Sequence, residues 1–299
     1  MFTHLLVPLD GSVMAESALP MAAGIAKRTH AALTLVHVIE RNAPSEVHSE
    51  RHLVTPREAA DYLAEVARRP IFAGLAVQTH VHEAEVRDVA RGITEHTTEL
   101  TPDLVIMSTH GKGGARRLFS GSMAQQVIGL GATPVLLVWP DAEEGTRETW
   151  RLILTPVDGD PSHEKGLPIA GDLAAAFGCT LHLLMVTPHI AELTGSEKLT
   201  STLLPGATRM KLEMESAGAE EYLQRVARTF EDRGIATGTE TSRDDPARAI
   251  VRTARRLSAD LIVLGTHGRS GTDAFWEGSV AARVVSRARV PLLLVPLRE

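Results

Sequence analysis

Short, nearly continuous apolar runs recur along this chain, and longer stretches with helical periodicity separate them. The runs form matching pairs, in the same order in each half of the sequence: 4–11 with 152–159, 33–38 with 181–186, 103–111 with 260–268, and 133–138 with 290–295. The spacing grows between the second and third pairs, which indicates a net insertion in the second copy, in the polar stretch at 191–206. The chain therefore contains an internal repeat of domain size.

Each apolar run is short and aliphatic, as expected for a strand that is buried on both faces. Patterns between the runs predict helices at 12–29, 57–72, 88–100, 217–233 and 246–257, and another beginning near Ser279. Strands that alternate with helices form βαβ units around a parallel sheet. We therefore predict an α/β fold of two tandem doubly wound domains, each a five-stranded parallel sheet with helices on both faces. The domains should span residues 1–140 and 150–299, with an acidic linker at 141–149.

Composition narrows the functional classes. The net charge is −6 and only 4% of the residues are aromatic, which argues against a nucleic-acid-binding surface. No stretch approaches the length of an apolar membrane span, and the N-terminus lacks the pattern of a signal peptide, so we expect a cytoplasmic protein. Cys179 is the only cysteine, which excludes an intrachain disulfide and favours a small core residue.

The segment with the most chemical information is Gly265-Thr266-His267-Gly268, which is followed after nine residues by Gly278-Ser279. It comes after a predicted strand and before a predicted helix. Gly265 has no Cβ, so a ribose can approach the backbone, and Gly268 permits a turn that other residues avoid. Gly278 and Ser279 open a helix whose N–H groups and positive dipole end attract phosphate oxygens. This spacing predicts a nucleotide phosphate site.

In these residues the second half resembles the ATP-binding members of the universal stress protein family, which carry the pattern Gly-x2-Gly-x9-Gly-Ser/Thr. A Pro-x-Asp segment after the first strand and a fifth strand introduced by proline also match, so the resemblance covers essentially the whole chain, once per half. The resemblance implies ATP as the ligand. We expect magnesium to accompany its triphosphate.

The resemblance also implies roles for individual residues in each half. In the second half, Asp158 would contact the ribose, the backbone of Val186 would meet adenine, and Gly265 would border the ribose. The phosphates would be surrounded by His267, Gly268, Gly278, Ser279 and Val280, and the binding set is completed by Pro156, Val157 and Leu264. The matching set in the first half is Pro8, Leu9, Asp10, Val38, Met107, Ser108, His110, Gly111, Gly121, Ser122 and Met123.

Ser108 is the one departure from the pattern, because it stands where the second half has Gly265. Its Cβ would press on a ribose if this position required a positive φ, so the second site is the better match, although we expect nucleotide in both. The glycines could instead form simple strand-to-helix turns. Asp10 and Asp158 could cap helices as well as contact a ligand.

Histidines elsewhere give no pattern typical of a metal site. His37 lies among apolar neighbours on a predicted strand, so we expect it to be buried and hydrogen-bonded. His48 with His52, and His80 with His82, lack the flanking ligands of a zinc site, so no metal centre is predicted.

These features favour an ATP-binding stress-response or regulatory protein with one nucleotide site per domain and no dedicated catalytic reaction. No paired carboxylates or arginine finger are assembled for hydrolysis, although slow ATP turnover stays open. One alternative is an ATP-consuming, ligase-like enzyme of related fold, but the loop after the first strand lacks the Ser-Gly-Gly-x-Asp-Ser signature of that class. The other alternative is a nucleotide-free interaction scaffold.

The apolar fifth strands, at 134–139 and 291–296, are candidates for assembly because each would be an edge strand with unpaired backbone groups. In the family that the chain resembles, fifth strands pair at a dimer interface. We therefore expect the two halves to pair through these strands into an internal pseudo-dimer. Association of two chains into a homodimer is a further expectation.

Overall fold

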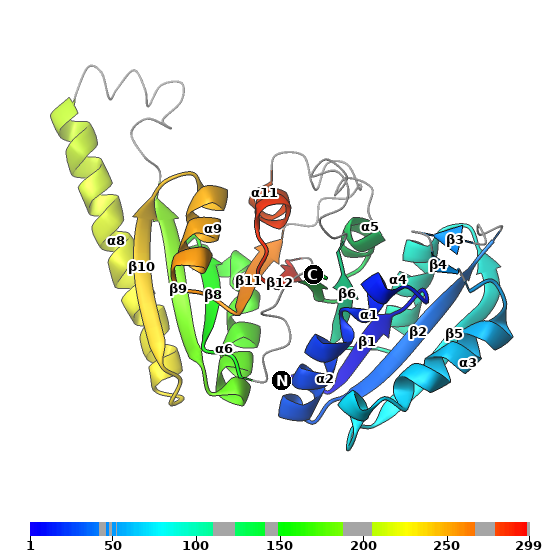
Figure 1. Cartoon of the computed structure of the whole chain (residues 1–299). Coiled ribbons are helices and arrows are strands. Elements are labelled where there is room, and N and C mark those ends of the chain that lie inside the picture. Colours follow the sequence, from blue (N-terminus) through cyan, green and yellow to red (C-terminus); the bar gives the residue numbers. More distant parts are fainter. Residues whose placement is uncertain are drawn as a thin grey trace. The chain divides into compact units, whose positions relative to one another are not determined.

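Parallel β-sheet forms in both halves of the chain from the apolar runs that the sequence predicts to be strands (Figure 1). In this computed structural model the described residues are 1–41, 46–47, 50–51, 53–109, 123–140, 149–187, 205–266 and 279–297. They divide into two compact units, one built on Met1–Thr149 and the other on Trp150–Gly265.

The first unit contains parallel strands in the order β5-β2-β1-β6-β7. Their bounds are β1 (His4–Pro8), β2 (Ala32–Glu40), β5 (Val77–Val86), β6 (Leu104–Ser108) and β7 (Val135–Val138). The central strands are buried on both faces, and Leu5, Leu33 and Ile106 are fully inaccessible to solvent. This arrangement confirms the predicted five-stranded parallel sheet. A short antiparallel pair, β3 (Glu46–Val47) with β4 (Glu50–Arg51), forms a separate two-stranded sheet.

The helices of the first unit are α1 (Val13–Glu16), α2 (Leu19–Thr29), α3 (Pro56–Ala67), α4 (Val89–Glu99), α5 (Met123–Leu130) and the 3₁₀ turn η1 (Pro70–Phe72). The helix predicted over 12–29 is divided in two. Ser12 caps α1, and the chain restarts as α2 with Pro20 in the first turn, where proline's missing N–H is tolerated. The helix predicted over 57–72 ends at Ala67, because Pro70 cannot continue an α-helix.

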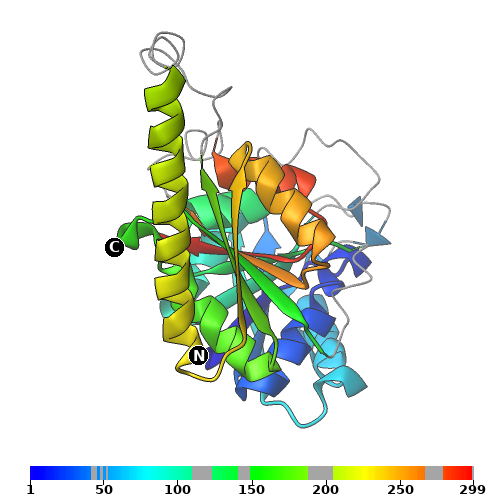
Figure 2. The ribbon, with the colours of Figure 1, turned by 90° about the vertical axis from the view of Figure 1, so that its left-hand side faces the viewer.

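The second unit repeats this arrangement with parallel strands in the order β10-β9-β8-β11. Their bounds are β8 (Leu152–Val157), β9 (Thr180–Thr187), β10 (Thr237–Arg243) and β11 (Leu261–Thr266). Connections that move along the sheet in opposite directions place their right-handed crossover helices on opposite faces. In agreement, α8 and α9 lie on opposite sides of these strands (Figure 2).

The helices of the second unit are α6 (Gly166–Phe177), α8 (Pro205–Glu231), α9 (Pro246–Arg256), α11 (Val280–Arg287) and the 3₁₀ turn η3 (Pro161–His163). The helix predicted over 217–233 begins earlier, at Pro205, and extends beyond the end of β10 (Figures 1 and 2). Its first turns gave no periodic apolar signal, because exposed residues such as Met210 and Met214 face no core.

The last strand, β12 (Leu292–Pro296), joins the sheet of the first unit, where it pairs antiparallel with β7. Leu292, Leu293 and Leu294 lie opposite Leu137, Leu136 and Val135. The predicted pairing of the two fifth strands is therefore confirmed. Because of this pairing, β12 belongs to the first compact unit and not to the half of the sequence that contains it. No helix among the described residues is long and apolar enough to cross a membrane.

Candidate functional site

The carboxyl ends of neighbouring strands bring the predicted nucleoside-binding residues to one edge in each unit. In the first unit β1 lies between β2 and β6, and in the second β8 lies between β9 and β11. The strand order therefore reverses at β1/β6 and at β8/β11, and open α/β sheets bind ligands at such points. Asp10 and Ser108 lie at the first of these edges, and Asp158 and Gly265 lie at the second.

Both aspartates precede a glycine in a tight turn. Gly11 has a φ of +93° and Gly159 a φ of +85°, a region that favours glycine because a Cβ would be strained there. Oδ1 of Asp10 accepts hydrogen bonds from the backbone N–H of Ser12 at 2.9 Å and from its hydroxyl at 2.6 Å. Ser12 in turn accepts the N–H of Ala15, so Ser12 is the helix cap and Asp10 holds it in place.

In the second unit the equivalent loop has an additional partner. Oδ1 of Asp158 accepts the N–H of Asp160 at 3.0 Å, and Asp160 is the N-cap of η3. Nδ1 of His163 lies 2.6 Å from Oδ2 of Asp158. The Asp158 side chain is nevertheless 57% exposed, so its carboxylate is oriented by the protein and open to a ligand hydroxyl.

The position shared by Ser108 and Gly265 does not need a positive φ. Among the described glycines, a positive φ occurs at Gly11, Gly74, Gly159, Gly178 and Gly234. Gly265 lies inside β11, and Ser108 is the last residue of β6, where it pairs with Val138. The backbone reason for ranking the second site above the first is therefore wrong. What still separates the sites is the size of the serine side chain.

The helix after β11 begins where the glycine motif predicts. Ser279 is the N-cap of α11, and its hydroxyl accepts the N–H of Ala282 at 3.1 Å. Val280 is the first residue of α11, and Met123 is the first residue of α5 in the first unit. The other predicted phosphate-side residues lie outside the described residues: His110, Gly111, Gly121, Ser122, His267, Gly268 and Gly278.

The remaining predicted residues lie within the last three residues of a strand or directly after it: Pro8, Leu9, Val38, Met107, Pro156, Val157, Val186 and Leu264. Behind this edge in the first unit, His37 is 1% exposed and its Nδ1 lies 2.7 Å from the carbonyl oxygen of Leu9. The expectation of a buried, hydrogen-bonded His37 is confirmed. Its ring therefore supports the end of β1 from inside the sheet.

A tyrosine–glutamate pair beside each Asp-Gly turn was missed from the sequence. The Tyr62 hydroxyl on α3 donates a 2.9 Å hydrogen bond to Glu16, and the Tyr222 hydroxyl on α8 donates to Glu164. Burial is the main reason that the pKa of both tyrosines lies above the usual value, and the glutamates add to it. The negative charges of Asp10 and Asp158 also raise these pKa values. The pairs therefore lie within electrostatic reach of the predicted ribose-binding carboxylates.

Cys179 precedes β9 and is 5% exposed. Burial raises the pKa of its thiol to about 12, so the group stays protonated at neutral pH. This agrees with the predicted role as a small core residue.

Two successive units with the same strand order and the same Asp-Gly turn define a tandem doubly wound α/β protein. The universal stress protein family model matches residues 1–138 and again residues 149–296, and the chain belongs to this family. A universal stress protein of Mycolicibacterium smegmatis is 26% identical over 97% of this chain and 96% of its own length. One of Methanocaldococcus jannaschii is 31% identical over 49% of this chain and 82% of its own length.

Solved structures agree with the fold. The crystal structure of a universal stress protein from Archaeoglobus fulgidus superposes with a TM-score of 0.65 and 17% identity, covering 98% of this chain and 96% of its own. Because the family model matches each half of the chain once, the chain is a tandem member of the family.

Proposed function

We propose that this tandem universal stress protein binds ATP, one molecule in each half, and acts as a regulatory protein without a dedicated catalytic reaction. The observation that carries the proposal is the position of the two ends of the glycine motif. Gly265 lies at the carboxyl end of β11 and Ser279 caps α11, and both belong to the second compact unit. A strand end followed by a helix start supplies backbone space for a ribose and a positive dipole end for phosphates.

The nucleoside side of the proposed site supports the same ligand. Asp158 follows β8, the parallel neighbour of β11, so both strands present their carboxyl ends at one edge. An exposed carboxylate held by His163 is suited to accept hydrogen bonds from the hydroxyls of a ribose. The first unit offers Asp10 in an equivalent turn, and Ser108 in place of Gly265. We therefore propose a second site there, in which the Ser108 side chain leaves less room for the ribose.

Magnesium would accompany the triphosphate, because a hard divalent cation neutralises neighbouring phosphate oxygens. A cytoplasmic location and assembly into homodimers are further parts of the proposal, whereas slow ATP hydrolysis stays open. Binding alone can regulate, because a ligand that favours one conformation of a loop shifts the population of that conformation.

Mass spectrometry of the nucleotide released from denatured, purified protein tests the proposal directly. We expect ATP at about two molecules per chain, provided that binding is near micromolar or tighter. Gly265→Val should reduce the yield to about one, since the added side chain occupies the ribose space. Ser108→Val is the matched variant in the first half and should also leave about one. Thermal melting of both variants checks that each is folded.

Absence of nucleotide from the purified chain, together with no heat on titration with MgATP, would overturn the proposal in favour of an interaction scaffold. Rapid substrate-dependent release of AMP and pyrophosphate would instead favour the ligase-like alternative. Retention of two ATP molecules by Gly265→Val would show that the motif does not line the site.

A further inference from the structure

Three histidines and a glutamate gather between β5 and α4 in the first unit. His80 and His82 occupy alternate positions on β5 and therefore share one face of the strand. His96 and Glu99 are three residues apart on α4 and share one face of the helix. The ring centroids of His80 and His82 lie 4.5 Å and 4.8 Å from the ring centroid of His96. We call these four residues the histidine cluster.

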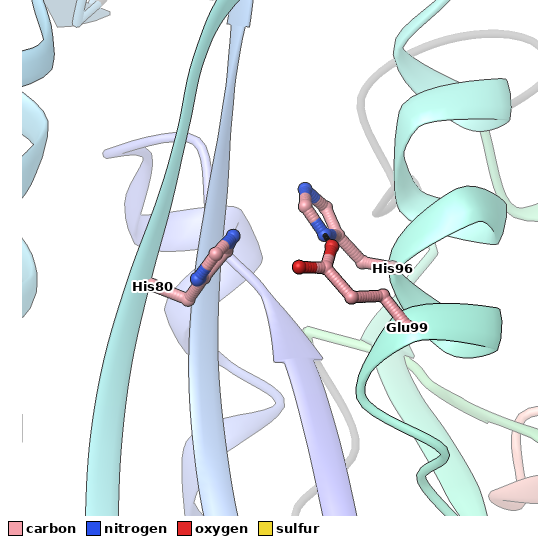
Figure 3. A group of neighbouring side chains, drawn as sticks. All are labelled: His80, His96 and Glu99. Atoms are coloured by element: carbon pink, nitrogen blue, oxygen red, sulfur yellow. Dashed lines mark hydrogen bonds and ion pairs between the residues drawn. The ribbon is translucent and has the colours of Figure 1, made fainter.

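The side chains of the histidine cluster converge on a common space. In Figure 3 the imidazole of His80 points from its strand towards α4, and His96 and Glu99 reach back towards the strand. One ligand atom from each of His80, His96 and Glu99 lies within 4.8 Å of the other two. Imidazole nitrogen and carboxylate oxygen are the donors that borderline divalent cations such as zinc prefer.

The spacing of the donors is close to that of a coordination sphere. Nδ1 of His96 lies 3.0 Å from Oε2 of Glu99. Two ligands about 2.0–2.1 Å from a tetrahedral zinc ion are roughly 3.3 Å apart, so these two atoms need to separate by only a few tenths of an ångström. The His80 donor has to approach by about 1.5 Å at most, which rotation of a half-buried side chain supplies.

The second nitrogen of His96 already has a partner that suits a metal ligand. Nε2 of His96 lies 2.9 Å from Nδ1 of His82. A metal on Nδ1 of His96 leaves the ring proton on Nε2, and that N–H can donate to His82. Ligating histidines commonly donate their other N–H to a neighbouring acceptor, which fixes the orientation of the ring.

The members of the cluster differ in exposure. His96 is 3% exposed, whereas the Glu99 side chain is 63% exposed, so the carboxylate faces the solvent from which an ion would enter.

We propose that His80, His96 and Glu99 bind one divalent transition-metal ion, with zinc the best chemical match, and that His82 positions the ring of His96. Two histidines and one carboxylate leave a fourth position for water, as in three-ligand zinc sites. The ion would connect the edge strand β5 to α4 and so stabilise this side of the first unit. The proposal does not depend on nucleotide binding, because none of these residues belongs to the proposed ATP sites.

Calorimetric titration of zinc into the tag-free, chelator-treated full chain, without nucleotide, tests this site. We expect about one zinc ion per chain and an increase in melting temperature that EDTA reverses. Cobalt substitution should give the absorption bands of a four-coordinate site with nitrogen and oxygen ligands. X-ray absorption of the zinc form should show nitrogen and oxygen neighbours near 2.0–2.1 Å and no sulfur.

Variants separate the cluster from adventitious binding by other histidines. His80→Gln and Glu99→Gln each remove one donor at a partly exposed position, and each should weaken zinc binding by at least about 100-fold. His82→Gln should weaken it by about 10- to 100-fold, as expected for a positioning residue. His30→Asn is the matched control, because His30 is exposed, has φ +57° and lies outside the cluster, and it should bind zinc as the unchanged chain does.

Two results would overturn the proposal. One is the absence of zinc binding by the unchanged, folded chain at about 100 μM zinc. The other is zinc binding by His80→Gln and Glu99→Gln that equals that of the unchanged chain, which would place the metal elsewhere. If the unchanged chain binds zinc but not ATP, only the proposed function is refuted, so the two proposals can fail separately.

Discussion

The Tyr62 hydroxyl donates a 2.9 Å hydrogen bond to the Glu16 carboxylate, and this contact fastens α3 to the end of α1. Arg69 completes the arrangement, because its two terminal nitrogens lie 2.7 and 2.9 Å from the two oxygens of Glu16. The second unit has the same contact between Tyr222 and Glu164. In both copies, therefore, a tyrosine of the longer helix, α3 or α8, contacts a glutamate at the end of the short helical segment, α1 or η3, that follows the first strand.

Replacement of Tyr62 by phenylalanine should therefore destabilise the chain modestly. The ring keeps its packing, but Glu16 loses one hydrogen bond, at a cost of about 0.5–1.5 kcal/mol in the free energy of unfolding. Tyr222→Phe should cost a similar amount. Differential scanning calorimetry of both variants measures the change. Equal melting curves for the variants and the unchanged chain would show that these hydroxyls contribute nothing to stability.

Asp103 gives a prediction for acid stability. Its Oδ2 accepts the backbone N–H of Thr3 at 2.6 Å, the Thr3 hydroxyl at 2.7 Å and the N–H of His4 at 2.9 Å. Burial acts to raise the pKa of this carboxyl, but these hydrogen bonds outweigh burial and hold it below the usual value. Because the folded-state pKa is lowered, the stabilisation is present above the unfolded pKa of about 3.9 and is lost as the pH falls through the folded value.

Asp103→Asn should consequently melt at a lower temperature than the unchanged chain at pH 7, by an amount that corresponds to about 1–3 kcal/mol. The difference should shrink as the pH falls below the unfolded value of about 3.9 and the wild-type carboxyl takes up a proton. Asp61→Asn, at an exposed position on α3, is the control and should show little difference at either pH. A difference for Asp103→Asn that stays constant with pH would contradict the charged role of this residue.

The strands and the repeat could be predicted from the sequence because burial on both faces leaves uninterrupted aliphatic runs such as 33–38. The predicted helix ends were less accurate where a proline ends the helix, as before Pro70, or where the residues are exposed, as in the first turns of α8. The Pro-x-Asp segments were visible in the sequence, but the positive φ at Gly11 and Gly159 was not predicted, and the position of Gly265, where a positive φ had been considered, does not need one.

Contacts between side chains of elements that are distant in the sequence could not be predicted. His80 and His82 could be seen to share a strand face, but their neighbours His96 and Glu99 come from α4. The i, i+3 spacing of that second pair was the only local signal, and it is common on helices. To predict that the two histidines of β5 lie next to His96 and Glu99, one has to know which helix packs against β5. The same holds for Tyr62 and Glu16, which are joined only through the packing of α3.

Ser108→Gly should lower the stability of the chain and raise the affinity of the first unit for ATP. Glycine in a strand costs about 0.5–1 kcal/mol, because it loses more conformational freedom on folding. If ATP binds as proposed, removal of the serine side chain should at the same time increase affinity at the first site. Calorimetric titration with MgATP in a Gly265→Val background isolates this site. Weaker ATP binding by the glycine variant would indicate that the Ser108 hydroxyl contacts the nucleotide.

The antiparallel pairing of β7 with β12 can be tested by a disulfide. Leu136 lies opposite Leu293, and directly paired residues in antiparallel strands have Cα atoms about 4.5–5.5 Å apart, within the range that a disulfide spans. In a Cys179→Ala background, Leu136→Cys with Leu293→Cys should therefore oxidise to an intrachain disulfide. Leu136→Cys with Leu292→Cys is the control, because neighbouring residues on a strand point to opposite faces.

Mass spectrometry of peptides from the oxidised, monomeric chain identifies the bond, and reduction should abolish it. The first variant should cross-link to a much greater extent than the control if the register is as observed. Equal cross-linking in both would mean that the strands slip, and a disulfide-linked dimer would mean that β12 pairs with β7 of a second chain. Because Leu136 and Leu293 are both about 1% exposed or less, slow oxidation is expected, and brief warming below the melting temperature should accelerate it.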